Sequence, residues 1–349
     1  MDDIHGILQA VSTHDVEGSV IATIVDVQGS AYKKEGAMML ISPDGLQTGM
    51  LSAGCLEEDL AGRIKHFGVG RQAELLTYDM RAEHDLLWGQ GSGCNGVIQI
   101  LVEPVNRALV FHLNKIKDLL DKGRTITVWK ELPAENNQMN YLYQSDEEHF
   151  GHVNQDDGFL HVTKNASYVS GEKGVKKLGE TKKRIYCDCY KPKSRLLIFG
   201  AGDDAKPLVS LADQSGFIVD LADWREAFCD KQRFPEVRHF YVGFPNELQQ
   251  QLKLKSSDFV ILLTHNFQRD KELLAFLKNE PLRYLGILGS AKRTKRLLGG
   301  QEAPANLFSP IGLTIDAEGP NEIAVSIVAE LIQQRKKQWS EEVSIRETS

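Results

Sequence analysis

The second half of the chain alternates short apolar runs with longer segments whose apolar residues recur at helical spacing. The runs are rich in Leu, Ile, Val and Phe, and they lie at 196–199, 217–221, 258–263 and 284–288. Continuous apolar runs of this length are typical of parallel strands that are buried on both faces. An amphipathic stretch at 323–332 follows, and Gly319-Pro320 precedes it as a helix start. This pattern predicts a Rossmann-like, doubly wound parallel sheet of the α/β class.

The first half has a different pattern, which predicts an α+β domain with a mixed sheet. Helical periodicity occurs at 4–11 and 108–121, and strand-like apolar runs lie at 20–27, 38–41, 97–102 and 125–129. Pro43-Asp44-Gly45 predicts the turn of a hairpin, because proline presets one dihedral angle and glycine supplies the positive one. The polar stretch 136–157 is expected to form loops.

The length of 349 residues is sufficient for two domains with separate cores. Lys191-Pro192-Lys193 forms a natural hinge between the two patterns. We therefore expect an N-terminal domain over residues 1–192 and a C-terminal, Rossmann-like domain over residues 193–349.

Charge and cysteine content exclude several classes of protein. The net charge of −7 argues against nonspecific binding of nucleic acid, which needs a basic face. Residues 1–8 are acidic where a signal peptide would be basic, and no apolar run reaches about 18 residues, so we expect no signal peptide and no membrane span. The five cysteines are odd in number and form no C-x-x-C pair, which favours a reducing cytoplasm and argues against structural zinc.

The first apolar run of the second half leads directly into G-A-G-D-D-A, which has the G-x-G-x-x-A spacing of the dinucleotide fingerprint. Gly200 would permit the tight turn, and Gly202 would let backbone N–H groups approach a pyrophosphate. Asp203 and Asp204 are awkward neighbours for a phosphate, because they add negative charge at the same helix start. A structural turn without a ligand is the alternative.

Two carboxylates follow about 20 residues beyond the glycines, at the spacing expected of a ribose contact. They are Asp220 and Asp223, and we favour Asp223 because it lies nearer the carboxyl end of its strand. The segment from Gly200 to Arg225 is therefore expected to hold a nucleotide or a phosphate.

Two further strand ends carry residues that could reach the same crevice. His265 follows the run at 258–263 and could carry a proton or contact a ligand, although a loop histidine bonded to backbone is an equal alternative. Gly289-Ser290 ends the next run, and cations follow at 292, 293, 295 and 296. These cations could neutralise a phosphate or form a solvated helix face.

The first half offers two cysteines in glycine-containing turns. Gly54 and Cys55 stand just before three carboxylates that favour a helix start. A thiol at a helix N-terminus can have a depressed pKa and act as a nucleophile or a soft metal ligand, although the nearby carboxylates oppose this. A small buried residue beneath a turn is the alternative.

The second cysteine lies in W-G-Q-G-S-G-C-N-G at 88–96, where Gly93, Cys94 and Gly96 precede a strand. Such a glycine-rich backbone loses much conformational entropy on folding, so a ligand that approaches the backbone closely would explain it. A wide turn or a bulge is the alternative.

An ordered series of motifs resembles one protein family. S-A-G-C-L-E, G-S-G-C-N-G, L-L-I-F-G-A-G, D-W-R, L-T-H, Y-L-G-I-L-G-S, S-P-I-G-L and E-I-A-V-S-I-V-A-E occur in that order between residues 52 and 330. Together they resemble the XdhC/CoxI family, accessory proteins for xanthine dehydrogenase and related molybdenum hydroxylases. The resemblance covers nearly the whole chain.

The resemblance implies a non-catalytic chaperone for the molybdenum cofactor (molybdopterin), active in the cytoplasm and in purine catabolism. Such a factor binds the cofactor, supports its sulfuration with a cysteine desulfurase and inserts it into a xanthine dehydrogenase-type apoenzyme. Cys55 and Cys94 would then contact the metal centre, since soft thiolates suit a sulfur-rich metal. A homodimer is expected, with neither nucleic acid nor membrane as partner.

The sequence departs from the family pattern at Ala53, Asn95 and Asp203, where S-G-G-C, G-C-G-G and G-A-G-H are common. The missing histidine after G-A-G puts any nucleotide chemistry that depends on it in doubt. Two other functions stay open as alternatives to the chaperone role: an NAD(P)-dependent oxidoreductase with His265 as proton carrier, and a nucleotide-sensing regulatory module.

Overall fold

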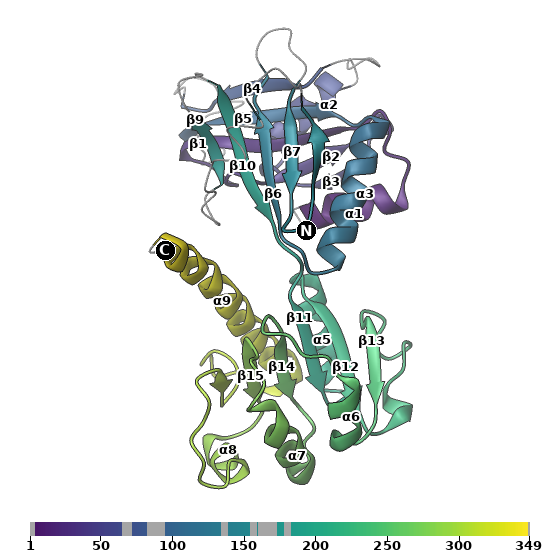
Figure 1. Ribbon diagram of the computed structural model, residues 1–349, viewed down its shortest axis with the longest axis vertical. Coiled ribbons are helices and arrows are strands. Elements are labelled where there is room, and N and C mark those ends of the chain that lie inside the picture. Colours follow the sequence, from purple (N-terminus) through teal and green to yellow (C-terminus); the bar gives the residue numbers. More distant parts are fainter. Residues whose placement is uncertain are drawn as a thin grey trace. The chain divides into compact units, whose positions relative to one another are not determined.

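The structure is a computed structural model of the chain, which divides into two compact units: Met1–Pro192 together with Val343–Ser349, and Lys193–Glu342 (Figure 1). It describes residues 4–64, 72–81, 95–133, 139–153, 159, 173–177 and 183–347, without the side chains of residues 55, 64, 95 and 338–347. In these described parts, no helix is both long and apolar enough to cross a membrane.

The N-terminal unit contains two five-stranded sheets, and every described pairing in them is antiparallel. The first has the order β3-β2-β1-β5-β4, with β1 (Val20–Ser30), β2 (Met38–Ile41), β3 (Gln47–Gly49), β4 (Glu74–Asp79) and β5 (Asn95–Pro104). The second has the order β8-β7-β6-β10-β9, with β6 (Ile126–Glu131), β7 (Tyr141–Gln144), β8 (His149–His152), β9 (Gly174–Lys177) and β10 (Arg184–Tyr190). Among the described residues of this unit, the helices α1 (Ile4–Thr13), α2 (Cys55–Ile64) and α3 (Arg107–Asp121) accompany the sheets.

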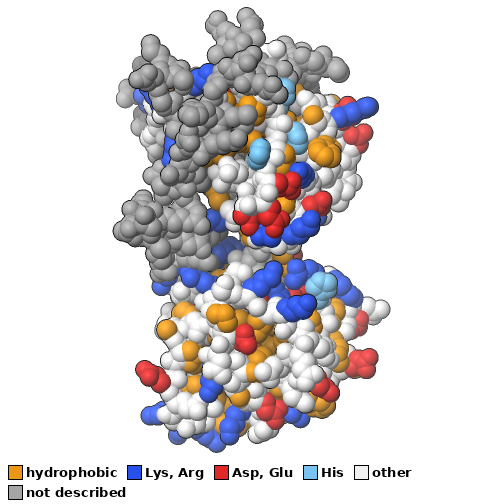
Figure 2. Space-filling model, in the orientation of Figure 1, with side chains coloured by type: hydrophobic (Ala, Val, Ile, Leu, Met, Phe, Trp, Pro, Cys, Tyr) orange, Lys and Arg blue, Asp and Glu red, His pale blue; other side chains and the backbone are white. Residues whose placement is uncertain are grey.

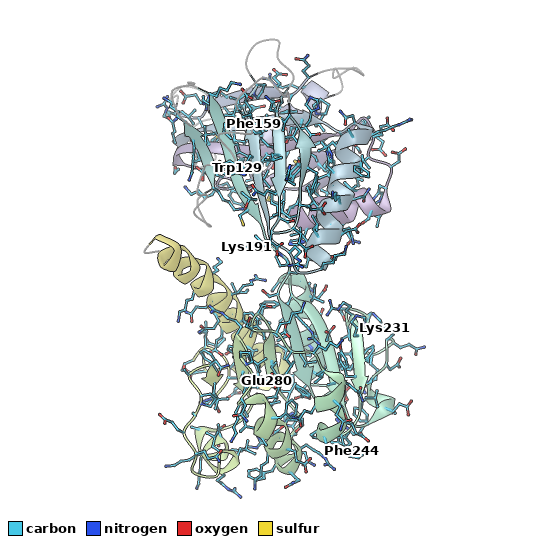
Figure 3. All side chains as sticks on the ribbon, in the orientation of Figure 1. Trp129, Phe159, Lys191, Lys231, Phe244 and Glu280 are labelled. Atoms are coloured by element: carbon cyan, nitrogen blue, oxygen red, sulfur yellow. The ribbon has the colours of Figure 1, made fainter. Side chains whose placement is uncertain are left out.

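The N-terminal cores arise from the predicted amphipathic elements. One cluster joins Ile7 of α1 and Leu113 and Ile116 of α3 to buried residues of the β-strands. A second cluster within this unit contains Trp129 and Phe159, which lie close together in Figure 3. The hairpin predicted at 43–45 is present between β2 and β3.

The prediction of loops at 136–157 is wrong for the described part of that stretch, because β7 and β8 form a hairpin there. Leu142 and Tyr143 are both buried, one in each of two hydrophobic clusters. The polar and aromatic composition of β7 does not show the alternation expected of a strand with one buried face. Both faces of β7 contact apolar side chains.

The C-terminal unit contains one parallel sheet of six strands with the order β13-β12-β11-β14-β15-β16. The strands are β11 (Arg195–Phe199), β12 (Ile218–Asp223), β13 (His239–Val242), β14 (Phe259–Leu262), β15 (Tyr284–Ile287) and β16 (Leu307–Phe308). The helices are α5 (Ala205–Gln214), α6 (Pro245–Gln251), α7 (Phe267–Leu277), α8 (Ala291–Leu297) and α9 (Gly319–Glu347), with a 3₁₀ turn at Glu226–Phe228. This strand order confirms the Rossmann-like fold. Successive strands are added on one side of β11 as far as β13 and then on its other side from β14 onward, so the topological switch point lies between the parallel neighbours β11 and β14.

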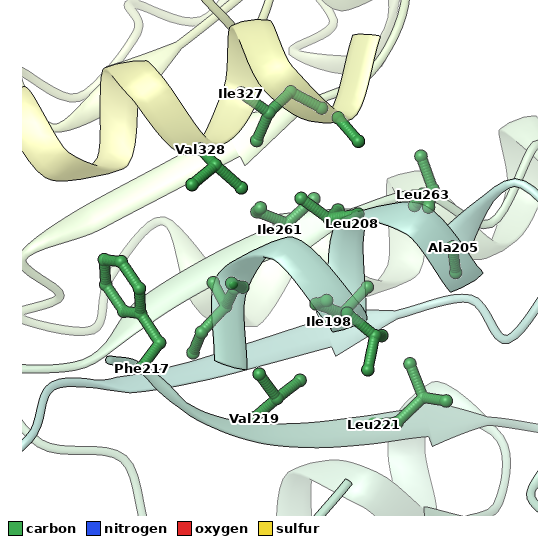
Figure 4. Packing of buried hydrophobic residues seen from close by; sticks show 14 of the residues in the cluster. Ile198, Ala205, Leu208, Phe217, Val219, Leu221, Ile261, Leu263, Ile327 and Val328 are labelled. Atoms are coloured by element: carbon green, nitrogen blue, oxygen red, sulfur yellow. The ribbon is translucent and has the colours of Figure 1, made fainter. Parts of the chain in front are cut away.

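Helices cover both faces of this sheet. Side chains of α5 and α9 pack on one face, where Figure 4 shows Ile327 and Val328 of α9 above Leu208 and Ile261. Residues of α6, α7 and α8 pack on the other face, around Leu197 and Val260. The strands are thus buried on both sides, as their continuous apolar runs predict. On the face of the molecule shown in Figure 2, basic and acidic side chains of this unit are interspersed with apolar ones.

Candidate functional site

The glycine turn after β11 is fixed by its own neighbours. Gly200 has a φ of +116°, and a Cβ there would clash with the carbonyl oxygen of Leu263, just beyond β14. The Gly200 N–H donates to the carbonyl of Ala222 at 2.8 Å. Gly200 is therefore required by the close approach of three strand ends, whatever the turn binds.

Asp223 is the last residue of β12, and its carboxylate accepts a hydrogen bond from the backbone of this turn. Its Oδ2 accepts the N–H of Ala201 at 2.8 Å, and its Oδ1 accepts the N–H of Arg225 at 2.8 Å. The Arg225 guanidinium adds Nε to Oδ1 at 2.9 Å and Nη2 to Oδ2 at 2.8 Å.

Burial alone would raise the pKa of Asp223, but hydrogen bonds from Arg225 and the Ala201 N–H lower it below its ordinary value. Asp223 is only 2% exposed, and each of its oxygens already accepts two hydrogen bonds. The carboxylate has four lone-pair directions, so its acceptor capacity is used within the protein. A ribose contact by Asp223 stays a prediction.

Two carboxylates, Asp203 and Asp204, directly precede α5. Asp203 is exposed, and its Oδ1 lies 2.8 Å from Lys206 Nζ and 3.0 Å from Arg233 Nη2. These two cations lower the pKa of Asp203. Asp204 is the N-cap residue but makes no capping hydrogen bond with its side chain. Instead its Oδ2 lies 2.5 Å from Nε2 of His265, and a Cβ at Gly202 would clash with its carboxylate.

A pocket of about 180 Å³ lies beside the Asp204–His265 pair. Its wall comes from the start of α5, the start of α9 and the segments just after β14 and β15. Apart from the pair, the lining consists of Leu208, Leu263, Leu288, Gly319, Pro320, Ile323, Ala324 and Ile327. His265 has a φ of +54°, a left-handed conformation that is uncommon for a residue with a side chain. The pocket is thus apolar with one polar pair.

A buried carboxylate that sequence reasoning missed ties the loops after β14 and β15 together. Asp270 is 1% exposed. Its Oδ1 accepts the hydroxyl of Thr264 at 2.5 Å, and its Oδ2 accepts Nη2 of Arg293 at 2.6 Å. No local motif marks this network, because the arginine lies 23 positions after the carboxylate and on another loop.

Gly289 and Ser290 form the start of α8. Gly289 has a φ of +121°, and the Ser290 hydroxyl caps the helix by accepting the N–H of Arg293 at 3.3 Å. The guanidinium of Arg293, one of the four cations after the glycine, is paired with the buried carboxylate of Asp270 and so is used inside the fold. The predicted residues of this unit, Gly200, Gly202, Asp223, Arg225, His265, Gly289 and Ser290, all lie at the carboxyl ends of β11, β12, β14 and β15.

The turn before α2 is held by one buried carboxylate. Glu57 accepts the N–H groups of Leu51 at 2.8 Å and Ser52 at 2.7 Å, and also the Ser52 hydroxyl and the Gly54 N–H. Burial alone would raise the pKa of Glu57, but the hydrogen bonds from Ser52 and Leu51 lower it. Cys55 is the first residue of α2. The S-A-G-C-L-E motif therefore encodes a rigid turn that presents residue 55 at a helix start.

The two glycines near the predicted thiols differ in their surroundings. Gly54 has a φ of +124°, and a Cβ there would meet open space. At Gly96, a Cβ would clash with the carbonyl oxygens of Gln28 and Ser30 in β1. Strand packing thus explains Gly96 by itself.

Gly93 and Cys94 lie outside the described residues, as does the side chain of Cys55. In the described parts there is no group of three or more His, Cys, Asp or Glu side chains that could hold a metal ion. The proposed pairing of Cys55 with Cys94 stays a prediction.

The chain matches three family descriptions: "XdhC Rossmann domain" over residues 196–331, "XdhC and CoxI family" over 14–79 and "BH1974-like, central domain" over 107–191. It is 40% identical over 337 residues to a Bacillus subtilis protein described as a probable subunit of xanthine dehydrogenase, covering 97% of this chain and 99% of that protein. It is 23% identical to the "Molybdenum cofactor insertion chaperone PaoD" of Escherichia coli, over 92% of this chain and 85% of that protein.

A solved structure has the same fold along nearly the whole chain. The crystal structure described as a xanthine dehydrogenase from Bacillus halodurans superposes with a TM-score of 0.85 and is 41% identical, covering 97% of this chain and 96% of that one.

Proposed function

The chain belongs to the XdhC and CoxI family, and on that premise we propose that it binds the molybdenum cofactor as cargo and inserts it into a xanthine dehydrogenase-type apoenzyme. A relative named as a molybdenum cofactor insertion chaperone supports this role. The protein would act as a carrier, because insertion needs the cofactor to be held and released rather than chemically consumed.

The observation that carries the proposal is the Glu57-held turn before α2. It places residue 55 at a helix start, next to exposed residues 53 and 54 and to the open space beside Gly54. A thiolate is a soft ligand that suits a sulfur-bound metal, and a fixed turn keeps such a ligand in place. The chemistry of this donor fits the cargo. We assign Cys55 as one contact and Cys94 as the second.

Sulfuration of the cargo follows from the same thiols. A cysteine desulfurase would pass the outer sulfur of its persulfide to the thiolate of Cys55 or Cys94: the S–S bond of the desulfurase breaks, its cysteine leaves as a thiolate, and a new S–S bond makes the cysteine of this chain a persulfide. We propose that this takes place in the cytoplasm, on a homodimer, in support of purine catabolism.

The test is retention of cargo by protein purified from cells supplied with molybdate. Molybdenum is measured by elemental mass spectrometry, and the pterin by fluorescence after oxidation. We expect both on the wild-type chain and neither on Cys55→Ser or Cys94→Ser. Cys187→Ser and Cys229→Ser are matched controls and should retain the cargo. Wild-type protein without molybdenum or pterin, or cargo that persists in Cys55→Ser and Cys94→Ser, would reject the proposal.

The geometry gives little support to the nicotinamide alternative. Asp223 has its acceptors occupied, and Asp203 and Asp204 place negative charge at the helix start where a pyrophosphate would bind. Equilibrium dialysis with NAD⁺ and NADP⁺ tests this directly. Tight binding that is lost in Gly202→Val would revive the oxidoreductase or nucleotide-sensing function.

A further inference from the structure

We propose that Tyr32 and Lys34 are further contacts for the cargo, with Lys34 at its phosphate and Tyr32 against its pterin ring. The inference rests on the proposed function and adds specificity to the same site in the N-terminal unit. The molybdenum cofactor joins a sulfur-bound metal to a pterin that carries a phosphate ester. A soft thiolate suits only the metal, so the site also needs a cation and a flat apolar surface.

The strand directions of the first N-terminal sheet bring the relevant segments to one edge. Neighbouring strands in the order β3-β2-β1-β5-β4 are all antiparallel, so β1, β3 and β4 run toward the edge from which β2 and β5 start. Cys55 follows the end of β3 by six positions, and Cys94 directly precedes the first residue of β5 in the chain. Both segments that we assign to the cargo therefore join the sheet at this edge.

The loop between β1 and β2 leaves the sheet at the same edge and carries Tyr32 and Lys34. Ser30, the last residue of β1, pairs with Asn95, the first residue of β5. Tyr32 follows Ser30 by two positions and Lys34 by four. The chain thus places an aromatic ring and a cation close to the strand that begins directly after Cys94.

The same loop is fixed to the core beneath the turn that starts α2. Ala31 packs against the hydrophobic cluster that contains Leu51 and Leu56, and these two residues flank the turn. At the other end of the loop, the N–H of Ala37 donates to the carbonyl of Lys34 at 3.2 Å. A loop held in this way keeps its side chains in place for a ligand.

Tyr32 and Met50 supply exposed apolar surface at this edge. Tyr32 is 58% exposed, and Met50, directly after β3, is 38% exposed. Lys33 Nζ lies 5.7 Å from the centroid of the Tyr32 ring and so adds positive charge beside it. Nucleobases stack on exposed aromatic rings, and a pterin offers the same kind of planar heteroaromatic face.

Lys34 is an exposed cation of this edge, and no carboxylate among the described residues lies within ion-pair distance of it. The guanidinium of Arg81, by contrast, donates to Asp79 through Nε at 2.9 Å and through Nη2 at 2.7 Å. The carboxylate of Glu35, next to Lys34 in the chain, accepts the N–H of Val27 at 3.1 Å. A phosphate at this edge would therefore gain a charge-assisted hydrogen bond from Lys34.

The test is the rate at which the full chain, purified with its cargo, loses pterin and molybdenum during dialysis. We expect Lys34→Gln and Tyr32→Ala each to lose both about tenfold faster than the wild-type chain, whereas Lys34→Arg and Tyr32→Phe should stay within about twofold of it. Lys122→Gln removes an exposed charge at the end of α3 and is the matched control, which should release cargo at the wild-type rate. Circular dichroism confirms that each variant is folded.

Salt separates the two contacts. Raising NaCl from about 50 mM to about 500 mM should narrow the difference between Lys34→Gln and the wild-type chain, because it screens the charge pair, and should leave the difference for Tyr32→Ala largely unchanged. Release at the wild-type rate from Lys34→Gln or Tyr32→Ala would overturn the contact assigned to that residue, while cargo on the wild-type chain would keep the proposed function intact. A wild-type chain without cargo would reject the proposed function and this inference together.

Discussion

Glu57 and Ser52 hold each other across the turn that starts α2: the Ser52 N–H donates to Glu57 Oε1 at 2.7 Å, and the Ser52 hydroxyl donates to Oε2. Glu57 is 8% exposed, and its carboxylate also accepts the N–H of Leu51 at 2.8 Å. One side chain thereby satisfies donors that would otherwise be buried without partners. The turn that carries Cys55 depends on this contact.

Glu57→Ala should lower the free energy of unfolding of the N-terminal unit by about 2 to 4 kcal/mol, because it leaves buried donors without an acceptor. Chemical denaturation monitored by tryptophan fluorescence measures the change. Glu58→Ala, at an exposed neighbouring position, is the control and should change stability by about 0.5 kcal/mol or less. A similar effect of both substitutions would contradict this assignment.

The same residue predicts a dependence on acid. The pKa of Glu57 is lower in the folded protein than its ordinary value of 4.5, so its stabilising contribution is fully present above pH 4.5 and is lost as the pH falls through the folded-state pKa. The stability difference between wild type and Glu57→Gln should therefore shrink below about pH 4. Urea titrations from about pH 7 to about pH 3 measure it, and a difference that grows on acidification would refute the sign.

Gly200→Ala should destabilise the C-terminal unit by about 2 kcal/mol or more, because the new Cβ would clash with the Leu263 carbonyl in a left-handed backbone. Gly299→Ala is the matched control. Its φ is +60° but its surroundings are open, so it should cost only the backbone strain of about 1 kcal/mol. Thermal unfolding compares the two, and equal losses would show that close approach at Gly200 is unimportant.

The two sheets of the N-terminal unit are joined by a buried ion pair, in which Lys130 Nζ of β6 lies 2.5 Å from Glu103 Oε2 of β5. The two side chains are only 3% and 4% exposed. Glu103→Ala should cost about 3 to 5 kcal/mol, since it leaves a buried ammonium without its partner. The double variant Glu103→Leu with Lys130→Met should be more stable than Glu103→Ala. Denaturant unfolding of the three proteins decides this, and a double variant that is the least stable would show that the pair itself is strongly stabilising.

Cys187 and Cys229 should be slow to react with iodoacetamide. Burial raises the pKa of Cys187 to about 12 and that of Cys229 to about 11, so each thiol is almost entirely protonated at pH 8. Alkylation at about pH 8, followed by peptide mass spectrometry, should be about a hundredfold slower at either residue than in urea-unfolded protein. Labelling at the unfolded rate would show that these thiols are accessible and ionised.

Much of the C-terminal sheet is predictable from the sequence, because its signals are local. The run at 196–199 and the glycine at 200 specify a buried strand and a tight turn without reference to distant residues. The role of Asp223 is only half predictable. Its position at the end of β12 follows from spacing, but its contact with the Ala201 N–H depends on how two strand ends meet in space.

Other features need tertiary information. Thr264, Asp270 and Arg293 form one buried network although the arginine lies 23 positions after the carboxylate in the chain. The apolar wall of the pocket comes partly from α9, more than a hundred residues after the glycine turn. Nothing in the local pattern of either segment indicates that they meet.

The Thr264–Asp270–Arg293 network also stiffens one wall of the pocket. Thr264 lies between two lining residues, Leu263 and His265, and Arg293 also contacts the carbonyl of the lining residue Leu288 at 3.4 Å. Moving either loop would strand a buried carboxylate without a partner, which is costly. The hydrogen bonds that hold this wall are therefore all made within the protein itself, so a molecule that entered the cavity would lose little ordering entropy in shaping it.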